Sequence, residues 1–304
     1  MKKIEGSLIL REKNIERKIA LISYLAQQSR LDVLEMLYKR GNGHWGGSAS
    51  VAEILAMLIF HIMKIDPQNP AWPNRDRLVL SKGHAAPILY VLLAMRGFFD
   101  ISNLKSSFRT LNSRFQGHPC MNKTPGVDMS TGALGHGLSV SLGMALAAKI
   151  LKNDYRTFVI IGDGDLNEGV TWEGIMAAAK FKPPGLFIMV DYNKVQLDGP
   201  SDIIMPLDPL LDKFKSFNLR VSDKIYDGHS VVEIMESFEW MMQNRNEPVV
   251  VIYKTRKGKG ISFMEDNYKW HGGKVDEKSY LLGKDELNKT LEKLSHLIFV
   301  EKES

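Results

Sequence analysis

Three short runs of apolar residues, separated by helical patterns, constrain the fold of this sequence most. The runs lie at residues 158–161, 186–190 and 249–253, and apolar residues at helical spacing fill 170–181 and 231–242 between them. Strands that are apolar along their whole length must be covered on both faces. We therefore expect an α/β protein with a doubly wound, mostly parallel sheet and helices on both of its faces.

Similar patterns lie on both sides of this central unit. Apolar residues at helical spacing predict a helix over 14–40 that ends at Gly41. Ser48 or Ser50 can cap a second helix that continues to about Lys64. The remaining expected elements are a strand at 78–80, a helix at 85–95, a helix at 138–152 and a strand at 219–221.

We expect a single domain, residues 1–304, because neither an internal repeat nor a low-complexity linker interrupts the pattern. A chain of this length is long enough to bury a sizeable hydrophobic core. The core is expected over about 14–280, and a charged, amphipathic tail without chemistry of its own follows over about 286–304.

Composition excludes several classes of protein. The net charge is only +5 and no arginine-rich block accompanies it, which argues against nucleic acid as a partner. The single cysteine, Cys120, cannot form an internal disulfide and fits a reducing cytoplasm. The longest apolar stretch, 51–65, is too short and too polar to span a membrane, and the basic residues 1–3 precede no signal-peptide core. We therefore expect a soluble cytoplasmic protein.

The turn Gly162-Asp163-Gly164 follows one predicted strand directly and precedes a helix. The next strand ends at about Val190, which places Asn193 at the same edge of the sheet, where ligands of open α/β sheets bind. A carboxylate, an amide oxygen and a nearby backbone carbonyl suit Mg²⁺, which shares its oxygen ligands with substrate phosphates. The spacing predicts a site for Mg²⁺ and a diphosphate, although plain βα loops also carry this turn.

Further motifs extend this signal to most of the chain. The segment 162–169 followed by Asn193 resembles the thiamine diphosphate signature, and the flanking motifs occur in the order seen in transketolases. These motifs are Gly43-His44-Trp45-Gly46-Gly47-Ser48, Ser81-Lys82-Gly83-His84, Gly117-His118-Pro119, Thr131-Gly132-Ala133-Leu134-Gly135 and Trp270-His271-Gly272. Over about 14–280 the chain resembles the N-terminal, diphosphate-binding half of a transketolase, similar to the smaller subunit of split transketolases.

The resemblance implies a role for each matching residue. Asp163, Asn193 and the carbonyl of Val195 are the implied ligands of Mg²⁺ or another divalent cation. The residues implied to bind the cofactor thiamine diphosphate are His84, Gly132, Leu134, Gly162, Asp163, Gly164, Asn193 and Val195. The residues implied to be catalytic are His44, His118, His271 and Glu168, of which the histidines contact donor hydroxyls or move protons and Glu168 lies at the subunit boundary.

Some positions depart from the family pattern or are ambiguous. His136 stands where glutamine is common, Trp45 replaces a small residue or proline, and Cys120 replaces an acidic residue. We expect His136 and Trp45 to flank the mouth of the active site, which puts the usual sugar-phosphate substrates in doubt. Asp165 is interpreted as a polar loop residue, and the basic run at 254–260 as a solvated loop rather than a phosphate clamp.

The resemblance also implies a missing partner. A second α/β domain supplies the pyrimidine pocket, a glutamate and the arginines that bind substrate phosphate, and 304 residues are about half of a full transketolase. We therefore expect a second subunit with the pyrimidine-binding and C-terminal domains, assembly as a heterotetramer, and transfer of a two-carbon ketol unit from a ketose donor to an aldehyde.

Three other functions remain open on the sequence alone. The chain could serve an enzyme with a 2-oxo acid donor, similar to deoxyxylulose-phosphate synthase or a 2-oxo-acid dehydrogenase. Residues 163–165 could be read as the DxD motif of a metal-dependent glycosyltransferase, which leaves Asn193 and the histidine motifs unexplained. The chain could also be a non-catalytic scaffold subunit.

Overall fold

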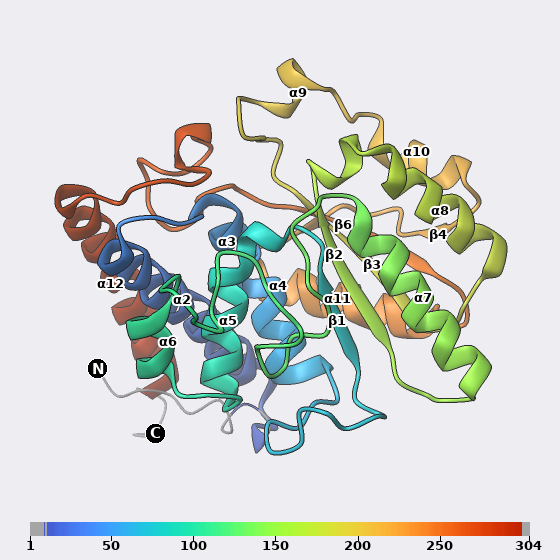
Figure 1. The fold of residues 1–304 in the computed structure, drawn as a ribbon, viewed down its shortest axis with the longest axis horizontal. Helices are drawn as coiled ribbons and strands as arrows, with labels where there is room; N and C mark the ends of the chain where they lie inside the picture. Colours follow the sequence, from blue (N-terminus) through green and yellow to red (C-terminus); the bar gives the residue numbers. More distant parts are fainter. Residues whose placement is uncertain (1–8, 10, 300–304) are drawn as a thin grey trace.

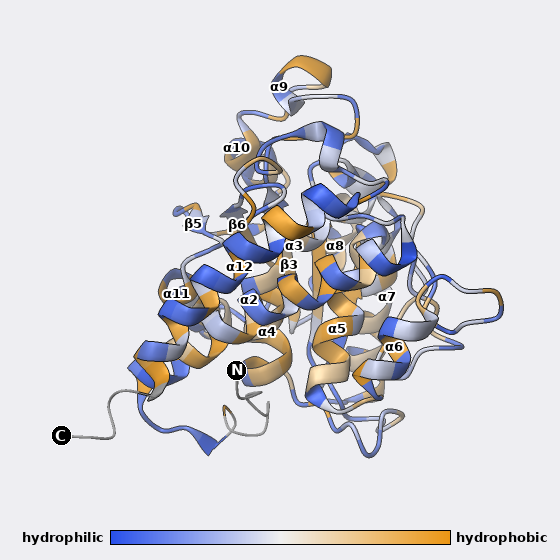
Figure 2. Cartoon of the chain, turned by 90° about the vertical axis from the view of Figure 1, so that its left-hand side faces the viewer, coloured by the Kyte–Doolittle hydropathy of each residue, from blue (hydrophilic) through white to orange (hydrophobic). Residues whose placement is uncertain are grey.

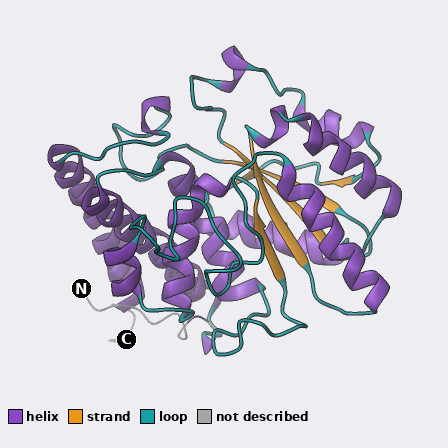
Figure 3. Ribbon diagram, viewed as in Figure 1, coloured by secondary structure: helices purple, strands orange, loops and turns teal. Residues whose placement is uncertain are grey.

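The computed structural model describes residues 9 and 11–299, which form a parallel sheet between two layers of helices (Figures 1 and 3). The strands pair in the order β1 (Arg77–Leu80), β2 (Thr157–Gly162), β3 (Leu186–Tyr192), β6 (Val249–Lys254), β4 (Arg220–Val221), and β5 (Tyr226–Asp227) also pairs with β6. Every pairing is parallel, which confirms the expected α/β fold. The basic residues 1–3 and the end of the expected tail, 300–304, lie outside the described residues.

Each strand contributes to two cores because successive side chains point to opposite faces of the sheet. In β2, Phe158 and Ile160 belong to one core while Val159 and Ile161 belong to the other, and all four are fully buried. The first core is covered by α2 (Ile15–Arg40), α4 (Ala52–Met57), α5 (Ala86–Arg96) and α11 (Val231–Gln243). The second is covered by α7 (His136–Leu151), α8 (Gly169–Phe181) and α10 (Leu210–Ser216).

Helix α2 forms where the sequence predicts it, and the last helix packs on it. The side chain of Asn14 caps its start by accepting a hydrogen bond from the backbone N–H of Arg17, and Gly41 ends it at φ +75°. Helix α12 (Glu277–Phe299) lies along α2, where the rings of Tyr38 and Tyr280 stack with centroids 4.1 Å apart. Figure 2 shows hydrophilic residues along much of the outer side of α12. Leu287 is fully buried, so the segment expected as a charged tail contributes to the core.

The expected helix from Ser48 or Ser50 to Lys64 is wrong as a single element. The chain instead forms α3 (Gly46–Ser50), α4 and a π-helical turn, η1 (Leu58–Ile62). At the break after α3, the carbonyl oxygen of Ala49 accepts two hydrogen bonds from the guanidinium group of Arg30, at 3.1 and 2.8 Å. A contact with α2 therefore interrupts this helix, and periodicity within the segment does not reveal it.

The other expected helices and strands form within two residues of their predicted bounds. Several short elements were not predicted: α10, β5, α6 (Ile101–Ser107), α9 (Ser201–Ile204), η2 (Gly83–Ala85), η3 (Asp165–Asn167) and η4 (Tyr268–Trp270). Among the described helices, none is both long and apolar enough to cross a membrane.

Candidate active site

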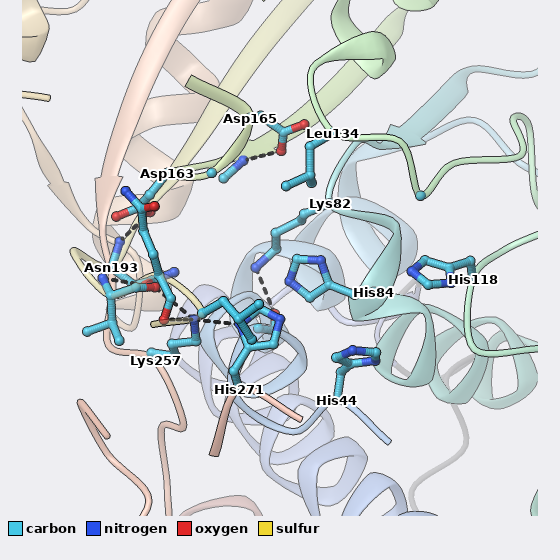
Figure 4. Close-up of a pocket in the computed structure, with 17 residues that line it drawn as sticks. His44, Lys82, His84, His118, Leu134, Asp163, Asp165, Asn193, Lys257 and His271 are labelled. Carbon is cyan, nitrogen blue, oxygen red and sulfur yellow. Dashed lines mark hydrogen bonds between the residues drawn. The ribbon is translucent and has the colours of Figure 1, made fainter. Parts of the chain in front are cut away.

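The loops that leave the carboxyl ends of β1, β2, β3 and β6 meet at one edge of the sheet and line a single pocket (Figure 4). This edge is where open parallel sheets bind ligands. The pocket brings together residues from all the motifs that the sequence singled out: His44, Gly47, Lys82, His84, His118, Gly132, Leu134, Gly162, Asp163, Gly164, Asn193, Val195 and His271. Asp165, Gln196, Leu197 and Lys257 complete its lining.

Asp163 lies at the turn after β2 and is held by the loop after β3. Its carboxylate accepts hydrogen bonds from the backbone N–H groups of Asn193, at 3.1 Å, and Lys194, at 2.6 Å. Burial raises the pKa of Asp163 to about 7, with a further increase from the neighbouring Asp191 carboxylate. The ionised form is thus costly in this protein environment, and a bound cation would stabilise it.

Three oxygen donors of different kinds converge beside this turn. Asp163 and Asn193 offer a carboxylate and a side-chain amide oxygen (Figure 4). Val195, which also lines the pocket, offers a backbone carbonyl. The amide group of Asn193 is oriented by its Nδ2, which donates to Asp191 at 3.1 Å. Within residues 9 and 11–299 no group of three or more His, Cys, Asp or Glu side chains could hold a metal by itself. The donor set therefore suits an ion such as Mg²⁺ that completes its coordination with phosphate and water.

Two buried lysines, Lys82 and Lys257, give the pocket a cationic side that was not predicted from the sequence. Lys82 is 2% exposed, forms an ion pair with Asp191 and donates to the carbonyl of Gly47 at 2.7 Å. Although burial alone would raise the pKa of Asp191, the Lys82 ammonium group lowers it below its ordinary value. Lys82 lies within one of the family motifs, and Lys257 lies within the basic run at 254–260. Neither was predicted as a site residue, because lysine side chains are mostly exposed to solvent.

Lys257 lies in the basic run that was expected to be a solvated loop, and for this residue the expectation is wrong. It is 3% exposed, and its Nζ atom donates to the carbonyl of Val195 at 2.7 Å and lies 2.9 Å from Nδ1 of His271. Burial lowers the pKa of Lys257 to about 8, although nearby Asp163 opposes the shift. The lysine is held close to the candidate metal ligands and remains a cation at neutral pH.

Four imidazoles form a cluster in the same pocket, next to the two lysines. The centroid of His44 lies 5.5 Å from that of His84, 6.0 Å from that of His118 and 5.5 Å from that of His271. The rings of His84 and His271 stack at 4.8 Å. The structure thus brings together all four histidines that the motifs singled out, from four separate segments.

Burial keeps this cluster uncharged. It lowers the pKa of His44 to about 4, with a further decrease from His118, and that of His271 to about 3, with a further decrease from Lys257. The pKa values of His84 and His118 are also lowered, first by burial. Neutral imidazoles can accept as well as donate protons at pH 7. The buried Nδ1 of His44 has no hydrogen-bond partner among the described residues.

Asp165 connects the glycine-rich segments rather than lying free in its loop. Its carboxylate is fully buried and accepts hydrogen bonds from the backbone N–H groups of Gly162, at 2.8 Å, and Gly135, at 2.7 Å, and from Ser81 Oγ at 2.6 Å. The interpretation of Asp165 as an ordinary polar loop residue is therefore wrong, because it joins three loops that line the pocket.

Glu168 is the one predicted catalytic residue that does not line the pocket. It lies at the start of α8 and is exposed.

Among the three departures from the family pattern, His136 is exposed and lines a neighbouring hollow with Thr131 and Gly132. Trp45 is 1% exposed, and its Nε1 donates to the carbonyl of Gly258 at 3.4 Å. Its expected place at the mouth of the site is wrong, because Trp45 does not line the pocket and packs in the hydrophobic core.

Comparison with known proteins places this geometry in a family. Residues 22–295 match the family model described as "Transketolase, thiamine diphosphate binding domain". The chain is 42% identical over 268 residues to the 6-deoxy-6-sulfo-D-fructose transketolase subunit SqwG of Clostridium sp. (strain MSTE9), covering 88% of this chain and 96% of that one. It is 35% identical to one subunit of the apulose-4-phosphate transketolase of Phocaeicola vulgatus, covering 91% and 97%.

Longer relatives match over only part of their length. Human transketolase is 36% identical, covering 84% of this chain and 40% of that one. The crystal structure of transketolase from Campylobacter jejuni superposes with a TM-score of 0.81 at 28% identity, covering 91% of this chain and 46% of that one. The chain therefore spans less than half the length of these two transketolases.

Proposed function

Because this chain belongs to the transketolase family as its thiamine diphosphate-binding domain, we propose that it is the diphosphate-binding subunit of a two-subunit transketolase. The enzyme transfers a two-carbon ketol unit from a ketose donor to an aldehyde acceptor. The observation that carries the proposal is the convergence of three oxygen donors, two buried lysines and four neutral imidazoles on one pocket at the carboxyl edge of the sheet.

The oxygen donors are assigned to Mg²⁺. Asp163, Asn193 and the carbonyl of Val195 supply the protein ligands, and their chemistry fits a hard cation that shares phosphate oxygens. The raised pKa of Asp163, about 7, supports this assignment, because a divalent cation next to a buried carboxylate favours its ionised form. The Gly162 and Gly164 positions keep the backbone of this turn accessible to the ligand.

The cationic side of the pocket is assigned to the diphosphate of the cofactor. Lys257, Lys82 and His84 line the pocket near the oxygen donors, and a lysine held by burial is a preorganised partner for phosphate oxygens. Gly132 and Leu134 lie on the loop that Asp165 fixes, and we assign them to the ring system of the cofactor. When bound, thiamine diphosphate supplies the carbanion stabilisation that ketol transfer requires.

The imidazoles are assigned to the substrate. His44, His118 and His271 are neutral at pH 7. His44 and His118 can accept a proton from a hydroxyl of the ketose, whereas His271, whose Nδ1 accepts from Lys257, can donate a hydrogen bond from Nε2 to a carbonyl oxygen. Glu168, exposed at the start of α8, is assigned to contact with the partner chain rather than with substrate.

The partner is assigned as a second subunit with the pyrimidine-binding and C-terminal domains, joined to this chain in a cytoplasmic heterotetramer. Support comes from the two relatives named as transketolase subunits, of which this chain covers 96% and 97%. Their names also favour a ketose donor over a 2-oxo acid. We propose that the donor is a ketose with an anionic terminal group, because those relatives are named for a sulfonated and a phosphorylated sugar.

Affinity capture from the native host, followed by a donor screen, tests this proposal. We expect a second chain with a pyrimidine-binding domain to co-purify, and the pair to transfer a ketol unit from a phosphorylated or sulfonated ketose. Release of CO2 from pyruvate by the pair would instead support a 2-oxo acid donor. Turnover by the pair that is unchanged in Asp163→Ala would support the scaffold function.

A further inference from the structure

A buried ion pair joins two helices, α2 and α4. The guanidinium group of Arg30 in α2 contacts both carboxylate oxygens of Glu53 in α4, at 2.5 and 2.6 Å, and their side chains are 2% and 9% exposed. A buried ion pair contributes little net stability relative to apolar residues of the same size. We therefore looked for a role of the Arg30–Glu53 pair in the groups that it contacts.

The ion pair holds the imidazole of His229 in one orientation. Nδ1 of His229 lies 3.1 Å from Glu53 Oε2, and Nε2 accepts a hydrogen bond from the backbone N–H of Arg256 at 2.9 Å. Because an N–H group donates to Nε2, this nitrogen carries no proton. The ring proton therefore lies on Nδ1, which donates a hydrogen bond to Glu53. Each nitrogen of His229 thus has a defined partner and direction.

Arg256 directly precedes the lysine that faces the pocket. The loop leaves β6 through Thr255, and after Lys257 the backbone N–H of Gly258 donates to the carbonyl of Gly46 at 3.0 Å. The loop that carries His229 approaches it closely, since a Cβ atom at Gly228 would lie 2.4 Å from Thr255 Cγ2. The backbone on both sides of Lys257 is therefore anchored, by His229 on one side and by α3 on the other.

We propose that His229 is a positioning residue for the cofactor: it connects the buried Arg30–Glu53 pair to the backbone N–H of Arg256 and so holds Lys257 against the diphosphate side of the pocket. This inference rests on the proposed function of the pocket. His229 itself does not line the pocket, and its effect on the ligand is transmitted through the backbone of residues 256 and 257.

Two substitutions of His229 separate the positioning role from general stability. In His229→Asn the amide nitrogen can still donate to Glu53 but the side chain is too short to accept from Arg256. In His229→Gln the side-chain oxygen can occupy the place of Nε2 and accept from Arg256. Each variant keeps one of the two hydrogen bonds of His229: Asn the one to Glu53, and Gln the one from Arg256. The comparison therefore isolates the hydrogen bond to the loop that carries Lys257.

Hydrogen–deuterium exchange and cofactor titration are measured on the assembled two-subunit enzyme. We expect the Arg256 amide of the apoenzyme to exchange about tenfold faster in His229→Asn than in the wild-type protein, because one hydrogen bond to the loop is lost. The apparent KM for thiamine diphosphate in saturating Mg²⁺ should rise about tenfold while kcat at saturating cofactor stays unchanged. His229→Gln should remain near the wild type in both measurements.

Equal exchange rates and equal KM values in the wild-type protein and His229→Asn would overturn the proposal, as would equal losses in both variants, which a merely structural role predicts. Failure of the wild-type enzyme to bind thiamine diphosphate would contradict the proposed function instead. The exchange rates measured without cofactor would then still decide whether His229 holds this loop.

Discussion

Nζ of Lys257 lies 2.9 Å from Nδ1 of His271. The lysine is protonated at neutral pH, since burial lowers its pKa only to about 8. It therefore donates to Nδ1, and the proton of the neutral His271 ring lies on Nε2. The lysine thus sets the tautomer of one imidazole in the cluster while its own charge faces the candidate metal ligands.

Replacing the lysine should change the titration of this histidine. The pKa of His271 is lowered to about 3, first by burial and then by Lys257, so Lys257→Met should raise it while leaving it below the ordinary value of about 6.5. The side-chain ¹⁵N shifts of His271, followed by NMR over a pH series, measure this. Lys39→Met, an exposed lysine on α2, is the control. An unchanged titration in Lys257→Met would show that the lysine does not act on this ring.

The neutral histidine cluster should make the protein less stable in mild acid. The folded-state pKa values of His44, about 4, and His271, about 3, lie below the value of about 6.5 in the unfolded chain. Between these values the unfolded chain binds more protons, so the free energy of unfolding is at its full value above pH 6.5 and decreases as the pH falls from there.

Denaturant unfolding of the isolated chain at pH 7.5, 6.5, 5.5 and 5.0 measures this dependence. The double variant His44→Gln/His271→Gln should lose part of the slope between pH 6.5 and 5.0, a range above the pKa values of most carboxylates. Identical slopes in both proteins would contradict the assignment of buried, neutral rings.

Asp163 should lower the stability of the apoprotein and be necessary for cofactor binding. Burial and Asp191 raise its pKa to about 7, so above about pH 4 its contribution to stability decreases as the pH rises through that value. Asp163→Asn should therefore raise the unfolding midpoint of the apoprotein at pH 8. The same variant should bind thiamine diphosphate with Mg²⁺ more than about tenfold less tightly, because even indirect partners of a metal contribute that much.

Calorimetric titration of both proteins with thiamine diphosphate and Mg²⁺, together with their thermal unfolding, checks this trade-off. Asp198→Asn, an exposed residue of the following loop, is the control. Equal cofactor affinity in Asp163→Asn and the wild type would remove Asp163 from the metal site.

Gly83 should tolerate no side chain. A Cβ atom there would lie 2.6 Å from the backbone carbon of Thr131 and 2.7 Å from the backbone nitrogen of Gly132, so Gly83→Ala must move the loop that carries Gly132 and Leu134. We expect lower stability, by about 1–3 kcal/mol as for other overpacked sites, and weaker cofactor binding. Gly143→Ala on α7, where a Cβ meets nothing within 4 Å, should instead stabilise the isolated chain by about 0.5–1 kcal/mol. Chemical denaturation compares the two, and equal effects would contradict the close packing at Gly83.

The strands and the main ligand loops could be predicted because their signals are local. The apolar run at 158–161 requires cover on both faces, and the turn after it fixes Asp163 at the carboxyl edge. Asn193 follows the neighbouring strand β3, so its proximity to Asp163 follows from parallel pairing alone. The order of the histidine motifs then identified four rings that the structure does bring together.

The rest depends on contacts between distant segments. Lys257 is buried because Gly46 and Val195 approach its loop, and a run of basic residues gives no sign of this. Trp45 lies next to a catalytic motif, yet its ring turns away from the mouth to contact Gly258. The break in the helix after Ser50 likewise depends on Arg30 in α2. The burial of the lysine, the orientation of the tryptophan and the break in the helix all depend on tertiary contacts.

We infer that this chain holds thiamine diphosphate and acts only together with a second subunit. Ketol transfer and thiamine diphosphate binding, measured for this chain with and without the co-purifying partner in the presence of Mg²⁺, test it most directly. We predict tight cofactor binding and ketol transfer by the pair, and no turnover by this chain alone. Ketol transfer by this chain alone, or a pair that binds no thiamine diphosphate, would contradict this inference.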